Sequence, residues 1–486
     1  MTPPNLLFLF TDEQRADTLA AYGNDQIQTP NLNRLASQSC VFPQTYVTQP
    51  VCTPSRATIL TGLYPHTCGC TENNIPLPPN IPCLPELLSA SDYATAYHGK
   101  WHLGDEIFPQ HNFQEWISIE DFYRTYYRPD KDKNARSSYH HWLIENGLTP
   151  ANGELFTRAE AARLPEEFGK PAFLAREASR FIRENQNHPF CLFVNFLEPH
   201  MPFFSPRDSQ YDPDQIPLPE NFRNPPTKDN PLKTRLFHRA DYVRGCSSPP
   251  LRTEADWRRL IANYWGLCSL VDTHVGTILQ TLHDCGLDDN TIVVYTSDHG
   301  DMMASHQLVA KCVMFEEAAR VPLLIRLPRQ QQSKVITGPV SQIDLVPTLL
   351  DLMDQPAPSH LQGKTLTPLI ESGGQSSDDI FIEWNGPNGG FGDIVGKVRV
   401  PDFLTELATP EQIEQALRDP VRTIVTPDGW KFNCSPMGEH ELYNLNDDPF
   451  ETTNLARSEQ HQNLIKQLAA RIHTWQSRTR DCTPLP

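Results

Sequence analysis

Three short apolar runs along the chain have the length and composition of buried strands. They are "LLFLF" at 6–10, "FCLFVNF" at 190–196 and "TIVVYT" at 291–296. Hydrophobicity that is continuous rather than alternating is typical of strands covered on both faces of a parallel sheet. The pattern therefore predicts an α/β fold with a mainly parallel central sheet flanked by helices.

A helical period follows the second apolar run. Apolar residues recur at intervals of three and four from Trp257 to Ile278, and Thr253 with Asp256 three residues later resembles a capping box. We therefore predict one long helix over 253–287 whose apolar stripe faces the core. A further strand is predicted from Val321 and a helix from Gln342.

The last quarter of the chain has a different pattern. Composition shifts at "ESGGQSSDD", and the short runs "IFIEW", "VRTIVT", "WKFNCS" and "HELYNL" then precede a helical pattern over 458–478. This predicts a main domain over 1–372 and a smaller α+β subdomain over 373–486 with an antiparallel sheet. The segments 105–180 and 205–251 show little periodicity, and such insertions often carry substrate selectivity.

Polar residues follow each of the three apolar runs. They are Asp12 and Glu13, then Glu198 and His200, then Asp298, His299 and Asp301. Ligands of open α/β sheets bind at the carboxyl ends of the strands, so these groups are expected to converge on one crevice. Carboxylates with an imidazole suit a divalent cation, and calcium, magnesium and manganese all stay open. For any one acidic residue alone, a helix N-cap is the structural alternative.

Basic residues offer a second set of candidates. In "HGKWHLG", Lys100 and His102 alternate, so on an extended segment both would face the same way, as a fixed cation beside a base or as a solvated strand edge. His200 lies between two prolines, and His306 and Lys311 lie on a loop. Each of these residues, taken alone, is weak evidence for a catalytic site.

Cys52 has a more informative context. Pro54, Ser55 as a candidate N-cap and the following "RATILTG" predict that a helix begins beside it. Anions and thiolates are stabilised at helix N-termini, and Arg56 adds a fixed positive charge within reach. Cys52 is therefore a candidate buried thiol, metal ligand, nucleophile or precursor of a modified residue.

The overall composition and charge argue against some partners and some kinds of site. The 486 residues include 41 Lys and Arg against 59 Asp and Glu, a formal charge of −18, which argues against nucleic acid and anionic membranes as partners. The first residues have no basic n-region, so no signal peptide is predicted and a cytoplasmic location is expected unless a leader has been removed. The twelve cysteines lack the regular spacing of a disulfide framework, which predicts reduced thiols. Cys68 and Cys70 form a CxC step, but no second cysteine or histidine pair follows at the interval that would indicate zinc.

The stretch "CTPSRATILTG" from Cys52 resembles the CxPSR signature of the type I sulfatases. In that family a separate formylglycine-generating enzyme oxidises the cysteine to Cα-formylglycine. Further blocks resemble sulfatases in the expected order: "LFTDEQRADTLAAYGN", "GKWHLG", "EPHMPF", "VVYTSDHGDMMASHQLVAK", "EEAARVPLLIRLP" and "HELYNLNDDPFETTNLA". The resemblance implies an alkaline phosphatase-like fold whose C-terminal subdomain carries a four-stranded antiparallel sheet.

The resemblance also implies a role for each matching residue. One divalent metal ion, calcium first, would be held by Asp12, Glu13, modified Cys52, Asp298 and His299. Many relatives have aspartate at the position of Glu13 and asparagine at that of His299. The implied catalytic set is Cys52 as nucleophile precursor, Arg56 and Lys100 holding the formylglycine, His102 as base, and His200 and Lys311 contacting sulfate and leaving group.

The implied activity is hydrolysis of aryl or carbohydrate sulfate monoesters to alcohol and inorganic sulfate. One hydroxyl of the hydrated aldehyde attacks sulfur, and deprotonation of the other by His102 expels sulfate. One alternative is a phosphonate monoester or phosphodiester hydrolase of the same superfamily, although those relatives tend to have alanine where this chain has Ser55. Another is a non-catalytic metal-binding or anion-binding homologue in which Cys52 stays a thiol.

The aromatic stretch "FYRTYYRP" at 122–129 lies in the first insertion. Its rings could stack on a sugar, or they could pack against the domain or a second subunit. The sequence predicts neither the natural substrate nor the oligomeric state.

Overall fold

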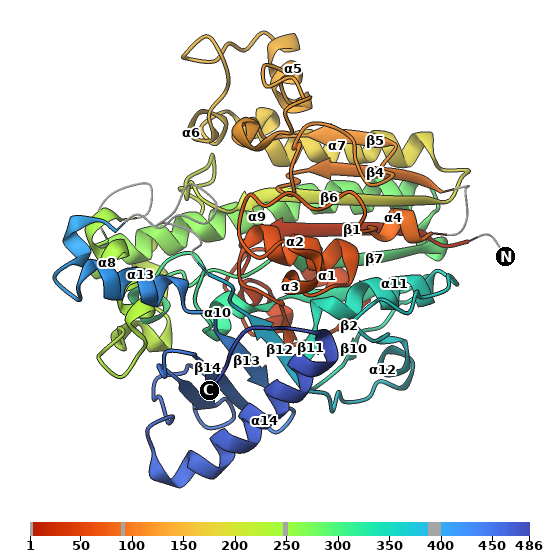
Figure 1. Cartoon of the computed structure of the whole chain (residues 1–486). Coiled ribbons are helices and arrows are strands. Elements are labelled where there is room, and N and C mark those ends of the chain that lie inside the picture. Colours follow the sequence, from red (N-terminus) through yellow and green to blue (C-terminus); the bar gives the residue numbers. More distant parts are fainter. Residues whose placement is uncertain (1–2, 89–92, 246–250, 387–399) are drawn as a thin grey trace.

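A large mixed sheet forms the centre of the molecule (Figure 1). The computed structural model describes residues 3–88, 93–245, 251–386 and 400–486. Its eight-stranded sheet has the order β10-β2-β9-β7-β1-β6-β4-β5. The strands are β1 (Asn5–Asp12), β2 (Cys40–Val41), β4 (Ala94–Gly99), β5 (Glu115–Ser118), β6 (Phe190–Pro199), β7 (Thr291–Ser297), β9 (Leu323–Arg326) and β10 (Lys334–Val335).

The three predicted apolar runs are three neighbouring strands. β1 pairs in parallel with β6 on one side and with β7 on the other, so that Leu6 lies opposite Cys191 and Ile292. β4 and β5 continue the parallel order, whereas β9 runs antiparallel to β7. The prediction of a mainly parallel sheet is confirmed, and the carboxyl ends of β1, β6 and β7 share one edge.

Alternate residues of β1 face two separate cores. Leu7 and Leu9 pack with α7 (Lys170–Glu184) and α9 (Glu254–Asp284), whereas Phe8 packs with α2 (Cys52–Thr61) and α11 (Leu345–Leu352). All three side chains are fully buried. Each contributes about 2–3 kcal/mol through burial of its apolar surface, which explains the continuous hydrophobicity of the strand.

The long helix α9 begins and ends close to its predicted bounds. Thr253 Oγ1 accepts the N–H of Asp256 at 3.2 Å, and Asp256 Oδ2 accepts the N–H of Thr253 at 2.8 Å. This reciprocal pair satisfies N–H groups that the first helical turn leaves without partners. The predicted capping box is therefore present. Within the described ranges, no helix combines the length and the hydrophobicity needed to cross a membrane.

The C-terminal part contains the expected four-stranded antiparallel sheet, drawn in blue in Figure 1. Its strands, in order, are β12 (Ile380–Glu383), β13 (Arg422–Val425), β14 (Trp430–Cys434) and β15 (Glu441–Asn444). Helix α14 (Gln462–Thr479) covers one face, where Trp475 stacks on Phe381 with ring centroids 5.0 Å apart. The predicted strands and closing helix are confirmed, while the boundary between 372 and 373 stays a prediction.

The two insertions contain regular structure, although their sequences show little periodicity. The first ends in α7, which buries Phe173, Leu174 and Phe181 along one face. The second contains α8 (Leu232–Arg244), and its residues 246–250 lie outside the described part of the chain. The sequence pattern of these helices is weak, because only one face of each is buried and charged residues separate the few apolar ones.

Gly99 links the end of β4 to β6. Its φ is 127°, and a Cβ built there would lie 2.0 Å from the backbone oxygen of Asn195. We expect Gly99→Ala to lower the free energy of unfolding by about 3 kcal/mol or more, because the new methyl group must displace a buried strand. Chemical denaturation of the full chain measures this change.

Gly147→Ala is the matched control for this substitution. Gly147 also has a positive φ, 82°, but a Cβ there would meet nothing within 4 Å. We expect a loss of about 1 kcal/mol from the backbone conformation alone. Equal losses for the two variants would contradict the steric explanation.

Candidate functional site

Four buried side chains meet at the carboxyl edge of the central sheet. Asp12 ends β1, Asp298 and His299 follow β7, and Cys52 is the first residue of α2. Cys52 Sγ lies 3.2 Å from His299 Nε2 and 3.6 Å from Asp12 Oδ1. The ligand atoms of all four residues lie within 4.8 Å of one another, so the predicted convergence is confirmed for the ends of β1 and β7.

Helix α2 begins one turn earlier than its sequence suggested. Val51 occupies the N-cap position, so Cys52 lies in the first turn, where backbone N–H groups favour negative charge. Ser55, expected as the N-cap, lies inside the helix instead and contacts the backbone oxygen of Asp298 and, at 3.1 Å, Gln342 Oε1. Pro54 is tolerated in the first turn because its missing N–H would have had no partner there.

The guanidinium of Arg56 forms hydrogen bonds to side chains from three neighbouring strand segments beside this cluster. Nη2 donates to Asp12 Oδ2 and Nε to Asp298 Oδ2, each at 2.8 Å, and Nη1 donates to Asn195 Oδ1 at 2.9 Å. The three ionic side chains are completely buried. Burial of charge is costly unless every group is paired, and here the planar guanidinium supplies the pairing.

The donor set at this edge fits a metal ion. His299 Nδ1 lies 2.9 Å from the backbone oxygen of Gly300, which orients Nε2 toward Cys52 and the two carboxylates. This is the arrangement by which a backbone oxygen fixes the tautomer of a metal-ligating imidazole. Although burial lowers it, Asp298 and Cys52 raise the pKa of His299 to about 9, so the cluster attracts positive charge.

Glu13 faces a different group of side chains. It accepts from Lys311 Nζ at 2.9 Å and lies 3.3 Å from His200 Nε2. Its ligand atoms group with those of Asp12 and His200, not with the cluster around Cys52. Burial raises the pKa of Glu13 to about 8, although Lys311 lowers it. Its predicted role as a metal ligand stays a prediction.

Lys100 and His102 reach the site by a route that differs from the expected extended segment. β4 ends at Gly99, and His102 has a φ of 57°, so a turn rather than strand alternation aims both side chains. Lys100 Nζ contacts Asp12 Oδ2 and lies 3.8 Å from Cys52 Sγ. Glu106 holds this turn by accepting the N–H groups of Trp101 at 2.7 Å and of His102 at 2.6 Å.

The imidazole of His102 is held on two sides. Its Nε2 lies 3.0 Å from Asn74 Oδ1, and the ring of Tyr123 stacks on it with centroids 4.1 Å apart. Burial, together with Lys100 and Arg56, keeps the pKa of His102 well below its usual value. The ring is therefore neutral at neutral pH, which suits a general base.

Tyr123 is a site residue to which the sequence analysis gave no role of its own. It belongs to the aromatic stretch at 122–129, and its hydroxyl accepts from Arg158 Nη2 at 2.8 Å. The packing alternative therefore holds for Tyr123 and for the buried Tyr127. Phe122 remains 69% exposed, and stacking of its ring on a ligand stays a prediction.

Two of the candidate residues lie in other surroundings. His306 Nδ1 and Nε2 lie 2.7 and 3.0 Å from the backbone oxygens of Asn224 and Phe450, so this side chain ties loops together. Glu198 is buried near Lys170, and burial raises its pKa to about 7. Neither residue belongs to the cluster of Asp12, Cys52, Asp298 and His299.

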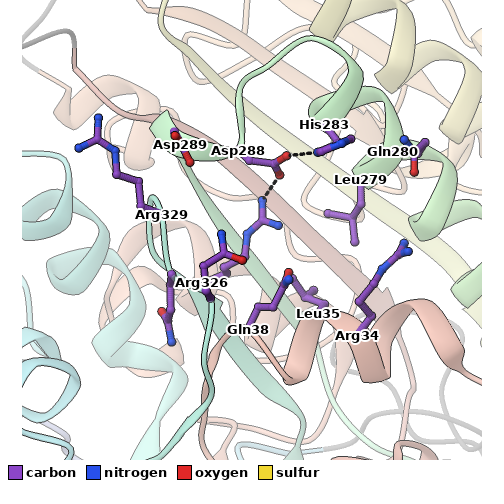
Figure 2. Close-up of a pocket in the computed structure, with 12 residues that line it drawn as sticks. Arg34, Leu35, Gln38, Leu279, Gln280, His283, Asp288, Asp289, Arg326 and Arg329 are labelled. Atoms are coloured by element: carbon purple, nitrogen blue, oxygen red, sulfur yellow. Dashed lines mark hydrogen bonds and ion pairs between the residues drawn. The ribbon is translucent and has the colours of Figure 1, made fainter.

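A cavity of about 400 Å³ lies at the opposite end of β7 from this cluster (Figure 2). Asp288, just before β7, accepts from Arg326 at 3.0 Å and contacts His283 at 2.7 Å across it. None of the residues with chemistry at the carboxyl edge lines this cavity. The chemistry therefore belongs to the strand ends and not to this opening.

Most of the chain resembles one known protein family. The family model described as sulfatase matches residues 4–355, most of the chain. The chain belongs to the sulfatase family. It is 28% identical to the uncharacterized sulfatase YidJ of Escherichia coli strain K12, over 96% of this chain and 87% of that protein. The chain is accordingly a sulfuric ester hydrolase by family.

Solved structures share the fold of this sulfatase over its full length. BT4656, in complex with its substrate D-glucosamine-2-N,6-O-disulfate, matches with a TM-score of 0.74 at 22% identity and covers 100% of this chain and 99% of that one. The phosphonate monoester hydrolase from Silicibacter pomeroyi matches with a TM-score of 0.77 at 22% identity, covering 99% and 96%. The expected alkaline phosphatase-like architecture is thus confirmed.

Stacking by Tyr123 predicts a specific mutational pattern. We expect Tyr123→Leu to lower kcat/KM for an aryl sulfate about tenfold or more, because the imidazole of His102 loses the ring that orients it. Tyr123→Phe keeps that ring and is expected to retain activity within about threefold. Steady-state kinetics on the mature sulfatase, with circular dichroism to check folding, measure both. Equal losses would assign the effect to the hydroxyl and not to stacking.

The ion-pair network behind Tyr123 predicts a dependence of stability on pH. Although burial opposes it, Arg158 and Lys170 lower the pKa of Glu120 to about 2. A depressed carboxyl pKa stabilises the folded state above the unfolded value of about 4.3, and this contribution is lost as pH falls toward 2.

Glu120→Gln tests this linkage. We expect it to destabilise the sulfatase by on the order of 3 kcal/mol at pH 7, and we expect the difference from wild type to shrink between pH 5 and pH 3. Urea unfolding at several pH values measures the difference. A difference that stays constant with pH would contradict the assignment.

Proposed function

We propose that this sulfatase hydrolyses carbohydrate or aryl sulfate monoesters at the carboxyl edge of its central sheet. The observation that carries the proposal is the position of Cys52 in the first turn of α2, against Asp12, Asp298 and His299. Arg56, Lys100 and Lys311 bring positive charge to this one place in a chain whose formal charge is −18. A sulfate ester needs that local concentration of cations.

Cys52 is the proposed precursor of the nucleophile. Its conversion by a formylglycine-generating enzyme supplies an aldehyde whose hydrate can attack sulfur and later release sulfate. Asp12, Asp298, His299 and residue 52 would hold one divalent cation, calcium first, with magnesium and manganese as alternatives. Bound there, the cation would neutralise charge on the sulfate oxygens.

The lysines of the site bind and orient the anion. Although burial opposes it, Cys52 and Glu13 raise the pKa of Lys311 well above its usual value, so this side chain stays charged. Lys100, which directly follows β4, also lies close to residue 52. Two fixed charges from separate loops define the orientation of a tetrahedral sulfate more closely than one flexible charge can.

His102 and His200 handle protons in this proposal. Burial and Lys311 keep the pKa of His200 well below its usual value, so it begins the reaction neutral, as His102 does. His102 accepts the proton from a hydroxyl on residue 52. His200 lies beside Glu13 and Lys311, where it contacts the sulfate or the departing alcohol.

The choice of a sugar sulfate rests on two observations. The structurally similar BT4656 has a sulfated glucosamine as its substrate, and Phe122 offers an exposed ring in the insertion that also carries Tyr123. Exposed aromatic rings stack on sugar faces. A cytoplasmic location stays a prediction from the sequence.

The phosphonate ester alternative has support from the fold alone. The phosphonate monoester hydrolase shares the architecture at 22% identity. In this chain Ser55 contacts the backbone oxygen of Asp298, a metal-site residue, and an alanine could not make that contact. We therefore favour the sulfate ester.

The first test is chemical. Protein produced with a formylglycine-generating enzyme is digested with trypsin, and the peptide that ends at Arg56 is weighed by mass spectrometry. We expect the mass of the aldehyde or its hydrate at residue 52. The same preparation is expected to turn over an aryl sulfate with a kcat/KM at least about tenfold above that for an aryl phosphonate ester.

Cys52→Ala is the matched control, with an expected loss of at least about a thousandfold in kcat. An intact thiol despite active maturation enzyme would promote the non-catalytic anion-binding alternative. A preference for the phosphonate ester would instead reassign the substrate and keep the nucleophile.

A further inference from the structure

We propose that Cys83, Glu86 and His111 form a second metal site, selective for zinc, that fastens helix α4 (Leu84–Leu87) to the loop after β4. The Cys83 sulfur, a Glu86 carboxylate oxygen and a His111 ring nitrogen all lie within 4.8 Å of one another. None of these residues belongs to the cluster around Cys52. The proposal therefore does not depend on the sulfatase reaction.

The start of α4 places the sulfur and the carboxylate side by side. Cys83 is the N-cap residue and Glu86 the third helical residue, and Glu86 Oε2 accepts the N–H of Cys83 at 2.8 Å. This capping geometry fixes the direction of the Glu86 side chain. The Cys83 side chain is fully buried, so its sulfur has little competition from water.

His111 arrives from a distant segment and is held against the same carboxylate. Its Nδ1 lies 2.9 Å from Glu86 Oε2, and its side chain is only 3% exposed. Both His111 and Asn112 have positive φ values, 52° and 61°. This backbone costs about 1–3 kcal/mol per residue, so the loop adopts it only where contacts such as this one hold it.

The types of donor distinguish this site from the one at the sheet edge. A thiolate, an imidazole and a carboxylate are the donors that zinc accepts together, whereas calcium and magnesium prefer oxygen alone. Three protein ligands leave one further position. Cys68 and Cys70 lie in the same buried cluster as Cys83 and provide additional thiols close by.

For the pair of His111 and Glu86, the geometry requires only a small adjustment to admit the ion. Zinc bonds of roughly 2.0–2.2 Å in a tetrahedral arrangement separate two ligand atoms by roughly 3.4 Å. The pair of His111 Nδ1 and Glu86 Oε2 is 2.9 Å apart, so it would open by about half an ångström. The Glu86 side chain is 26% exposed, which leaves room on its solvent side for this displacement, and zinc would replace the proton that joins the two groups.

The consequence would be a stiffer loop beside the catalytic base. The ring of His111 lies 6.0 Å from that of Trp101, and Glu106 holds the N–H groups of Trp101 and His102. A metal ion at His111 would therefore stabilise the segment that carries His102 without contacting substrate. Its role is structural.

Cobalt binding tests the site in the full-length chain. The experiment uses the Cys52→Ser variant, because residue 52 then cannot contribute a thiolate to a metal at the sheet edge. Co²⁺ is added, and absorption is recorded in the near ultraviolet, where thiolate-to-cobalt charge transfer appears. We expect one thiolate-bound Co²⁺ per chain, displaced by Zn²⁺. Adding Cys83→Ser should abolish the band, and adding Cys285→Ser, at the end of α9, should leave it unchanged.

Two further variants test the site without removing Cys83, in case the Cys83→Ser variant does not fold. His111→Asn and Glu86→Gln, each in the Cys52→Ser background, are expected to bind Co²⁺ at least about tenfold more weakly while circular dichroism stays native. Zn²⁺ is expected to raise the Tm of the parent and not that of His111→Asn. Absence of the band from the parent, or its survival after Cys83→Ser, would overturn the proposal. Neither result bears on sulfate ester hydrolysis, which mass spectrometry at residue 52 tests separately.

Discussion

The buried guanidinium of Arg56 is the interaction on which the rest of the site depends. It binds Asp12 at the end of β1, Asp298 after β7 and Asn195 in β6, so one side chain joins three adjacent strands. Without it, two carboxylates would face each other in a dry interior, where like charges repel strongly. Because Arg56 lies one turn after Cys52, the same contacts also fix the start of α2.

Electrostatics connects this framework to function. An acidic chain gathers Arg56, Lys100 and Lys311 around one crevice, and burial prevents water from weakening their fields. Burial, together with these cations, keeps His102 and His200 neutral. Fixed cations beside neutral bases are what binding a sulfate ester and moving a proton both require.

Much of the fold was predictable because its signals are local. The central strands are continuous apolar runs, α9 carries its own capping box, and the C-terminal strands are short runs separated by turns. Helix α7 escaped notice because it buries only one face and its other face is charged. The insertion around Tyr123 offered no period, and only its packing against His102 gives it a role.

By itself, the sequence determined which segments become strands, that Cys52 lies near the start of a helix, and which charged residues gather at the strand ends. These follow from hydrophobic period, from helix-start residues and from the rule that parallel strands share an edge. Only the tertiary structure decided that Glu13 faces Lys311, that a turn rather than a strand aims His102, and that His111 meets Cys83. Such contacts join residues far apart in the chain, and their geometry depends on how whole elements pack, which no local pattern encodes.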